Sequence, residues 1–366
     1  MKNYFEKYTS NTIAGSANQY FYIADDDKKI HTGRIFYRLT NGGEFNYSLL
    51  FSNVIDSTYM DGAVSHKNLP CDAYFIKKLS LCVTKECEND ACDNFVEVTF
   101  DGKQSKWVNP GEFFCTDPVL LNVQKGDYLC VEISFSGKMI PYLEEAIIPT
   151  FLLENGEWVV SKLMPFPSMI GCDRKPKLRV GFLGDSLTQG IGTKKNTYTH
   201  WCALLSETLG EEYSYWNLGI GSGRAEDAAT DGAWLYKAKH NDLVAVCYGA
   251  NDLYWGGFSA DYIKKSILEV VKKLKAAGCV VFVQTIPPFD YSPEHAVIWH
   301  EVNNWILSDL KEHCDMVFDN AWFLKADEGA PQNTKYGSHP NAEGCEVWAE
   351  NLYPHLKKLI EETANK

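Results

Sequence analysis

The sequence has no run of apolar residues long enough to cross a membrane. No stretch of its 366 residues approaches the roughly 18 consecutive apolar residues that a spanning helix needs. The first residues, from Met1 to Tyr8, also carry no apolar core of the kind found in secretory signals. We therefore expect a cytoplasmic protein without a membrane partner.

Positive charge is also scarce. Lys and Arg number 35 against 48 Asp and Glu, which gives a net charge of −13. A negative field repels phosphate backbones, and no basic run or basic helix offsets it. The composition therefore argues against a nucleic-acid partner.

The 12 cysteines do not follow a metal-binding pattern. Cys82, Cys87 and Cys92 are spaced five apart, which matches no common zinc spacing. Cys202 and Cys247 lie in apolar segments, as small buried side chains do. We expect reduced thiols, which agrees with a cytoplasmic location, and no metal.

Motifs of nucleotide-binding proteins are missing or incomplete. The sequence contains no Gly-x-x-x-x-Gly-Lys-[Ser/Thr], and Arg224 stands where the run Gly219-x-Gly-x-Gly223 would need its last glycine to bind a dinucleotide. The Gly-x-Ser-x-Gly motif of α/β-hydrolases, in which the serine is the nucleophile, is also incomplete, because Thr188 replaces its last glycine. We expect no cofactor.

The first half of the chain has the pattern of an all-β domain. Short β-rich runs alternate with turn residues, and two of these runs flank Asn41-Gly42, which predicts a hairpin. A second hairpin turn is predicted at Asp101-Gly102. We expect a β-sandwich or jelly-roll-like domain over 1–176, including a proline-rich linker. The predicted strands cover 33–39, 45–51, 95–100, 128–135, 147–153 and 158–160.

From residue 177 the pattern changes to alternating strands and helices, which predicts a doubly wound parallel sheet over 177–366. The predicted strands are 178–183, 213–218, 242–248, 279–285 and 315–319. The predicted helices are 198–209, 224–239, 259–277, 293–313 and 342–362.

Polar residues follow successive strands of this predicted sheet. Ser186 follows the first strand, the segment 219–224 follows the second, and 249–252 follows the third, while 338–341 leads into the last helix. Loops that follow parallel strands lie on one edge of a sheet, where ligands bind. We expect these segments to meet in one crevice.

These residue types suit acyl transfer. The Ser186 hydroxyl needs a base, and His339 is the candidate. A tetrahedral intermediate carries a negative oxygen that needs hydrogen-bond donors. The backbone N–H of Ser186, an N–H within 221–223 and the carboxamide of Asn251 could supply them.

Four blocks of the sequence resemble a known family. Gly184-Asp-Ser-Leu187, Asn217-Leu-Gly-Ile-Gly221, Gly249-Ala-Asn-Asp252 and His339-Pro-Asn341 are similar to the blocks of the SGNH hydrolases, also called GDSL esterases. The resemblance covers about 177–360. It implies a flavodoxin-like sheet with Ser186 as nucleophile, His339 as base and Asn251 as oxyanion donor. A β-rich half before such a domain is similar to two-domain bacterial carbohydrate acetylesterases.

The sequence departs from the family pattern at two positions. Ser222, between Gly221 and Gly223, stands where the family usually has the glycine whose amide is an oxyanion donor, so the inward amide could belong to Gly221 or Ser222. Tyr336 stands where the family has the aspartate that orients the histidine. Another acid, Asp327 or Glu328, or a backbone carbonyl could hold the imidazole instead. We favour a Ser186–His339 dyad.

Three further residues have two interpretations each. Asp185 could be taken for a triad acid, but because it neighbours the nucleophile in sequence we assign it a structural role in the turn. Arg224 could line the substrate pocket or bond its own loop, and Trp255 could pack in the core or stack on a sugar.

We expect an esterase that removes O-acetyl groups from small sugars or oligosaccharides. A short-chain lipolytic esterase or thioesterase is the alternative, and a carbohydrate-binding protein without catalysis is a third. The β-rich domain could form a wall of the cleft, set specificity or make a homodimer contact.

Overall fold

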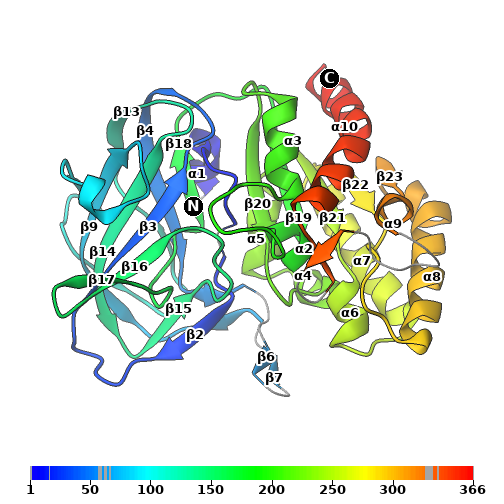
Figure 1. The fold of residues 1–366 in the computed structure, drawn as a ribbon, viewed down its shortest axis with the longest axis horizontal. Helices are drawn as coiled ribbons and strands as arrows, with labels where there is room; N and C mark the ends of the chain where they lie inside the picture. Colours follow the sequence, from blue (N-terminus) through cyan, green and yellow to red (C-terminus); the bar gives the residue numbers. More distant parts are fainter. Residues whose placement is uncertain are drawn as a thin grey trace. The chain divides into compact units, whose positions relative to one another are not determined.

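The chain divides into two compact units. The computed structural model describes residues 2–15, 17–56, 60–61, 64–65, 67–325, 333–335 and 338–365 (Figure 1). The first unit comprises 1–56 and 68–176, and the second comprises 57–67 and 177–366.

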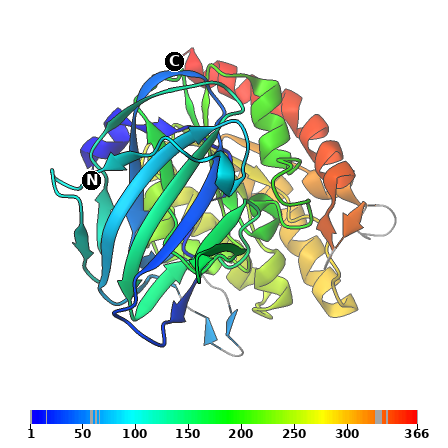
Figure 2. The ribbon, with the colours of Figure 1, turned by 60° about the vertical axis from the view of Figure 1, so that its left-hand side comes forward.

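The first unit is mostly β, as predicted, and contains two larger antiparallel sheets. One sheet has five strands and the other has seven. Strands β9, β14 and β3 run side by side at the centre of the seven-stranded sheet (Figure 2). The five-stranded sheet contains β1 (Thr9–Ser10), β18 (Met169–Cys172), β4 (Gly43–Ser52), β12 (Phe113–Cys115) and β13 (Val119–Val123). The seven-stranded sheet contains β10 (Val96–Val98), β9 (Tyr74–Thr84), β11 (Lys106–Val108), β14 (Tyr128–Gly137), β3 (His31–Arg38), β16 (Thr150–Glu154) and β17 (Glu157–Val160).

Smaller elements complete this unit. They are the helix α1 (Lys2–Lys7), the 3-10 turn η1 (Asn89–Ala91), and the strand pairs β2 (Tyr20–Ile23) with β15 (Met139–Tyr142) and β5 (Val54–Ile55) with β8 (Leu69–Pro70). The finer jelly-roll assignment stays a prediction.

The hairpin predicted around Asn41-Gly42 is wrong. Strand β3 pairs with β14 and β16, whereas β4 pairs with β12, β13 and β18 in the other sheet. The turn is instead held by a distant segment, because Asn11 accepts the N–H of Asn41 at 2.9 Å and donates to its carbonyl at 3.1 Å. An Asn-Gly pair indicates a turn, but it does not determine which strands pair on either side.

The turn predicted at Asp101-Gly102 is present. Both residues have positive φ, 49° and 75°, and Phe100 and Lys103 form a two-bond bridge around them. The flanking strands β10 and β11 then pair with β9 and not with each other.

The second unit contains the predicted parallel sheet. Its strand order is β20-β19-β21-β22-β23, which is the 2-1-3-4-5 order of flavodoxin-like folds. The strands β19, β20 and β21 are buried almost throughout, which agrees with cover on both faces. The bounds are β19 (Arg179–Gly184), β20 (Ser214–Gly219), β21 (Leu243–Cys247), β22 (Val280–Gln284) and β23 (Met316–Phe318).

The helices form two packed groups around this sheet (Figure 1). In one group, Trp201 of α3 stacks on Trp348 of α10 with ring centroids 4.7 Å apart. The helices are α2 (Ser186–Gln189), α3 (Trp201–Leu209), α4 (Ala225–Ala229), α5 (Ala233–Ala238), α6 (Ala250–Tyr254), α7 (Ala260–Ala276), α8 (Pro293–Ser308), α9 (Asn320–Leu324) and α10 (Ala342–Ala364), with a 3-10 turn, η2 (Leu310–Glu312). Two short pairs, β6 (Met60–Asp61) with β7 (Val64–Ser65) and β24 (Thr334–Lys335) with β25 (His339–Pro340), belong to this unit.

One predicted helix, 224–239, is two helices. Helix α4 ends at Ala229, Asp231 adopts a left-handed φ of 64°, and Gly232 caps α5. The apolar spacing continues across this break, which is why the sequence pattern did not reveal it. Across the part of the chain that the structure describes, no helix is long and apolar enough to span a membrane.

Candidate active site

Ser186 lies at the junction between β19 and α2. Asp185 caps the helix by accepting the N–H of Leu187 at 3.0 Å. Gly184 must be glycine here, because a Cβ would collide with the Thr188 hydroxyl and lie 2.5 Å from the carbonyl oxygen of Cys247. This packing fixes the nucleophile candidate at the carboxyl end of the strand, with 7% of its surface exposed.

The structure brings His339 to Ser186 across 153 residues of sequence. The His339 Nε2 atom lies 2.8 Å from the Ser186 Oγ atom, which is hydrogen-bonding distance. The next residues position the histidine, because Asn341 caps α10 by accepting the N–H of Gly344 at 2.9 Å. The pair can therefore share a proton without a large movement.

The loop after α2 packs closely against the backbone and the Cβ of the histidine. Gly192 has φ +102°, and a Cβ there would lie 2.5 Å from the Pro340 carbonyl oxygen and 2.8 Å from the His339 Cβ. Only a residue without a side chain allows the two segments to approach this closely. The position of His339 therefore depends on Gly192.

Two backbone N–H groups in the loop that follows β20 donate hydrogen bonds within the protein. The N–H of Gly221, one of the two predicted donors, already donates to Gln189 Oε1 at 2.6 Å. The N–H of Gly223 donates to the Ile220 carbonyl at 3.0 Å. The N–H of Gly221 is therefore bonded within the protein in this structure, and the assignment of Gly221 or of Ser222, which has φ +60°, as oxyanion donor stays a prediction.

Asn251 lies in the first turn of α6, which follows β21. Its Nδ2 donates one hydrogen bond to the Gly223 carbonyl at 3.1 Å. This bond ties the carboxamide to the loop that carries Ser222. A carboxamide has two N–H groups, so the second can serve a substrate oxygen.

The residues next to Ser186 and Asn251 in the sequence, Asp185 and Asp252, have buried carboxyl groups. Burial, together with the negative charge of the nearby Asp252, raises the pKa of Asp185 to about 7. Burial likewise raises the pKa of Asp252 to about 7, although that carboxyl accepts the N–H groups of Ala225 at 3.0 Å and Glu226 at 3.4 Å. Asp252 thus anchors the start of α4, and Asp185 holds the turn at Ser186.

Arg224 bonds its own loop. Its guanidinium pairs with Asp227 at 3.2 Å, and the two residues form a capping box at the start of α4. Only 6% of Arg224 is exposed. These contacts support the loop-bonding interpretation of Arg224.

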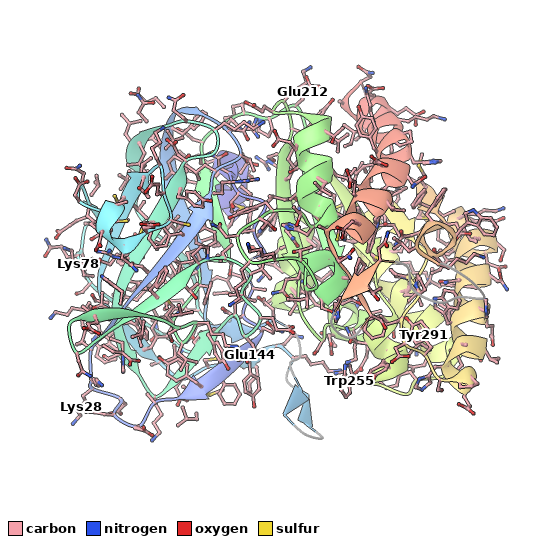
Figure 3. All side chains as sticks on the ribbon, in the orientation of Figure 1. Lys28, Lys78, Glu144, Glu212, Trp255 and Tyr291 are labelled. Carbon is pink, nitrogen blue, oxygen red and sulfur yellow. The ribbon has the colours of Figure 1, made fainter. Side chains whose placement is uncertain are left out.

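Trp255, which is labelled in Figure 3, ends a row of aromatic rings that leads to the histidine. It is 57% exposed, so it is not a core residue. The centroid of its ring lies 5.1 Å from that of Tyr254, and the Tyr254 centroid lies 5.5 Å from that of Phe289. The Phe289 ring packs edge-on against the imidazole of His339, with the two centroids 5.4 Å apart. The row gives the site an apolar rim with one exposed indole.

The residues proposed to orient His339 lie outside the described part of the chain. They are Asp327 and Glu328, and Tyr336, which stands at the family's aspartate position, lies outside it as well. The choice between a dyad and a triad therefore stays a prediction.

Sequence reasoning missed Phe289 and Gln189. Phe289 follows the fourth strand of the sheet, at the edge already predicted for the site, so the same rule applied to one more loop could have found it. Gln189 acts through a side-chain bond to a distant amide, and the sequence carries no signal for that contact.

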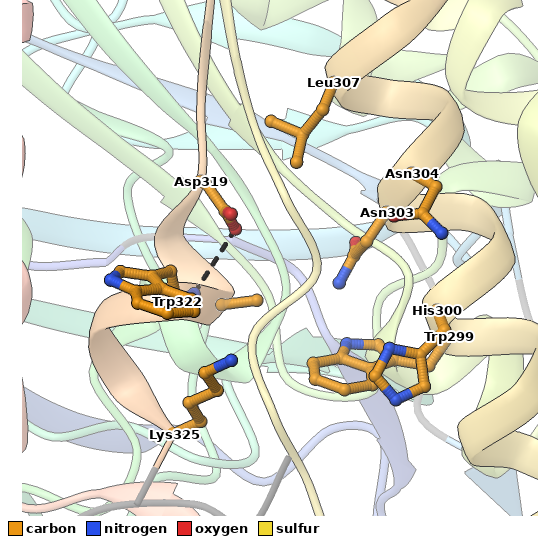
Figure 4. A pocket seen from close by; sticks show the side chains of 9 residues that line it. Trp299, His300, Asn303, Asn304, Leu307, Asp319, Trp322 and Lys325 are labelled. Carbon is orange, nitrogen blue, oxygen red and sulfur yellow. Dashed lines mark hydrogen bonds between the residues drawn. The ribbon is translucent and has the colours of Figure 1, made fainter. Parts of the chain in front are cut away.

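A cavity of about 430 Å³ lies between α8 and α9 (Figure 4). At its wall the Asp319 carboxylate accepts the N–H of Trp322, and the Lys325 ammonium lies 4.0 Å from the Trp322 ring. Ser186, His339 and Asn251 do not line it. The lining residues are Trp299, His300, Asn303, Asn304, Leu307, Asp319, Ala321, Trp322 and Lys325.

Within the described ranges, no group of three or more His, Cys, Asp or Glu side chains could hold a metal.

Comparisons with known proteins were made with the sequence and with the fold. A search of curated proteins found no match. Among solved structures, a psychrotrophic esterase from Pseudoalteromonas sp. is 22% identical with a TM-score of 0.40, over 50% of this chain and 98% of its own. A carbohydrate acetylesterase family member from Sinorhizobium meliloti is 17% identical with a TM-score of 0.41, over 50% and 99%. A carbohydrate esterase family 3 protein from Talaromyces cellulolyticus is 21% identical with a TM-score of 0.38, over 50% and 99%.

The family comparison is specific for the second unit. Residues 182–347 match the model of the GDSL-like lipase/acylhydrolase family. The match spans the strand that ends at Ser186, the Asn251 segment and His339. Residues 182–347 therefore form a domain of the GDSL-like lipase/acylhydrolase family.

Proposed function

We propose that this protein is a serine esterase that removes acetyl groups from the hydroxyls of carbohydrates through an acyl-enzyme intermediate. The observation that carries the proposal is the 2.8 Å contact between Ser186 Oγ and His339 Nε2 at the carboxyl edge of a parallel sheet. The family match supports an acylhydrolase, and the acetyl group and the sugar are our proposal.

The chemistry follows from the positions of the donors and the base. His339 Nε2 takes the proton of Ser186 Oγ as that oxygen attacks the ester carbonyl. The backbone N–H groups of Ser186 and Ser222 and the Asn251 carboxamide donate to the negative oxygen of the intermediate. His339 then gives this proton to the sugar oxygen as the bond between that oxygen and the acyl carbon breaks. A water molecule, deprotonated by the same imidazole, releases acetate and restores Ser186.

The aromatic rim supports a sugar as the leaving group. An exposed indole presents a flat apolar face on which the C–H groups of a sugar ring pack, while its edge stays polar. Trp255 is 57% exposed and is joined to His339 through Tyr254 and Phe289. The row is short, as expected for a site that holds one sugar next to the reacting ester.

Hydrolysis of an acetylated xylose or glucosamine by the full chain tests the proposal. We expect release of acetate that disappears in Ser186→Ala and in His339→Ala. The matched control is Ser308→Ala, which changes an exposed serine at the end of α8. Equal rates for wild type and Ser186→Ala would leave only a binding function.

A profile of acyl length separates the acetylesterase from its alternative. We expect kcat/KM to fall as the acyl chain of a sugar ester grows from acetyl to octanoyl. A preference for octanoyl, or for an acyl thioester over the acetylated sugar, would replace the proposal with a lipolytic esterase or a thioesterase. Trp255→Ala should raise KM for the sugar ester and leave that for para-nitrophenyl acetate unchanged.

A further inference from the structure

Three cysteines from separate segments meet on the seven-stranded sheet of the first unit. Cys82 in β9 and Cys130 in β14 lie directly opposite each other in the antiparallel ladder. Cys92, after the turn η1, packs against this pair, together with aromatic side chains. All three are free thiols. Directly opposed residues on adjacent strands have Cβ atoms about 5 Å apart, so the thiols of Cys82 and Cys130 lie close together.

The three thiols differ in their access to solvent. Cys82 and Cys130 are buried, with 1% and 0% of their surface exposed. Cys92 is only partly buried, and it lies in a turn whose neighbours Asp93 and Asn94 are exposed. Among these three thiols, Cys92 is therefore the one that a small oxidant in solution reaches first.

Cys92 also has the charge environment of a reactive thiol. The Arg34 guanidinium is held close by, because it donates to the carbonyl of Asn89 at 2.8 Å and pairs with Glu132 at 2.9 Å. A hydrogen bond from the Cys130 thiol, and then the positive charge of Arg34, lower the pKa of Cys92 to about 7. Burial raises the pKa of Cys130 far above its usual range. Cys92 is thus the thiolate of the cluster, and Cys130 keeps its proton.

We propose that Cys92 is a peroxide-reactive thiol and that Cys130 resolves it to a Cys92–Cys130 disulfide. The Cys92 sulfur attacks one oxygen of hydrogen peroxide, the O–O bond breaks, and the released hydroxide takes a proton to become water. Cys92 is then a sulfenic acid. The Cys130 sulfur attacks the Cys92 sulfur, the S–O bond breaks, and the hydroxide leaves as water with the proton of Cys130. Two thiols and one peroxide give one disulfide and two waters.

The contact pattern favours Cys130 over Cys82 as the resolving thiol. Cys130 and Cys82 both donate hydrogen bonds to Cys92, and the bond from Cys130 contributes more to lowering the pKa of Cys92. Cys82 and Cys130 oppose each other, but both are buried and burial raises the pKa of both. Without a thiolate, that pair does not begin the reaction.

Alkylation and oxidation of the full chain test this site. At pH 7, iodoacetamide should label Cys92 at least about tenfold faster than Cys314, because the thiolate is the nucleophile. Cys314 is the matched control, since it is also partly buried but burial raises its pKa to about 11. Labelling of Cys92 no faster than Cys314 would overturn the proposal.

Peptide mapping after one equivalent of hydrogen peroxide identifies the disulfide. We expect a Cys92–Cys130 linkage that is absent in Cys92→Ser, and a dimedone-trapped sulfenic acid at Cys92 in Cys130→Ser. A Cys92–Cys82 linkage, or sulfinic acid at Cys92 of the wild-type chain, would contradict the assignment. Wild-type mapping needs no variant to fold. Ser186→Ala should form the same disulfide, so failure of the proposed esterase leaves this test intact.

Discussion

At the scale of single residues, the site depends on donors that must point at a developing charge. Asn251 is held by one hydrogen bond to Gly223 and has a second N–H for the substrate. We expect Asn251→Ala to lower kcat about 10²- to 10³-fold with little change in KM, because this donor acts mainly in the transition state. Steady-state kinetics with para-nitrophenyl acetate measure the effect.

Asn351→Ala is the matched control for this prediction. Asn351 also donates its carboxamide to a single backbone carbonyl, that of Val347, but it lies on α10 away from the site. It should leave kcat within about twofold of wild type. If Asn251→Ala behaved like this control, Asn251 would be a structural residue and not an oxyanion donor.

At the scale of elements, the loop after α2 sets the distance between Ser186 and His339. A methyl group at Gly192 would push against the His339 Cβ and the Pro340 carbonyl. We expect Gly192→Ala to lower kcat/KM by about 10²-fold, because displacing a catalytic group by about 1 Å costs that much. Kinetic assays at equal folded concentration, with circular dichroism as the check on folding, measure it.

Gly210→Ala is the control that distinguishes the clash of a methyl group at residue 192 with His339 from the backbone strain of a positive φ. Gly210 has nearly the same φ, +100° against +102°, but a Cβ there meets nothing within 4 Å. It should cost about 1 kcal/mol of stability and leave kcat/KM unchanged. Equal losses of activity in both variants would mean that strain, and not the contact with His339, explains Gly192.

A second prediction at this scale concerns Asp252, which anchors the start of α4. Its pKa is about 7 in the folded protein and near 3.8 in an unfolded chain. Between these values the folded state binds the proton and the unfolded state does not, so this group makes stability fall as pH rises through that window. Asp252→Asn should reduce the loss of unfolding free energy between pH 5 and pH 8 by roughly 1–2 kcal/mol. Urea titrations followed by tryptophan fluorescence measure it.

Asp231→Asn is the control for Asp252→Asn. Asp231 lies between α4 and α5 with 42% of its side chain exposed, and it pairs with Lys239. This variant should keep the pH dependence of the wild type. The same change in both variants, or in neither, would show that the buried carboxyl does not govern this pH dependence.

At the scale of the whole molecule, strand–helix alternation predicted the sheet and therefore which loops share an edge. That is why Ser186 and His339 could be placed together from residues 153 apart. The hairpin at Asn41-Gly42 could not be predicted correctly, because the pairing partners are set by contacts with Asn11 and other distant segments. The hydrogen bond from the Gly221 N–H to Gln189 could not be predicted for the same reason, since it is a tertiary contact.

The net charge of −13 gives a final prediction for the molecule as a whole. A field of this sign repels anionic substrates over a distance that salt shortens to about 8–10 Å at physiological ionic strength. We expect kcat/KM for the anionic ester para-acetoxybenzoate to rise about two- to fivefold between about 20 and 200 mM salt. The neutral para-nitrophenyl acetate should stay constant and is the control. A neutral ester that responds equally would point to an effect of salt on the fold, whereas no response of the anion would mean that local donors at the site outweigh the field of the chain.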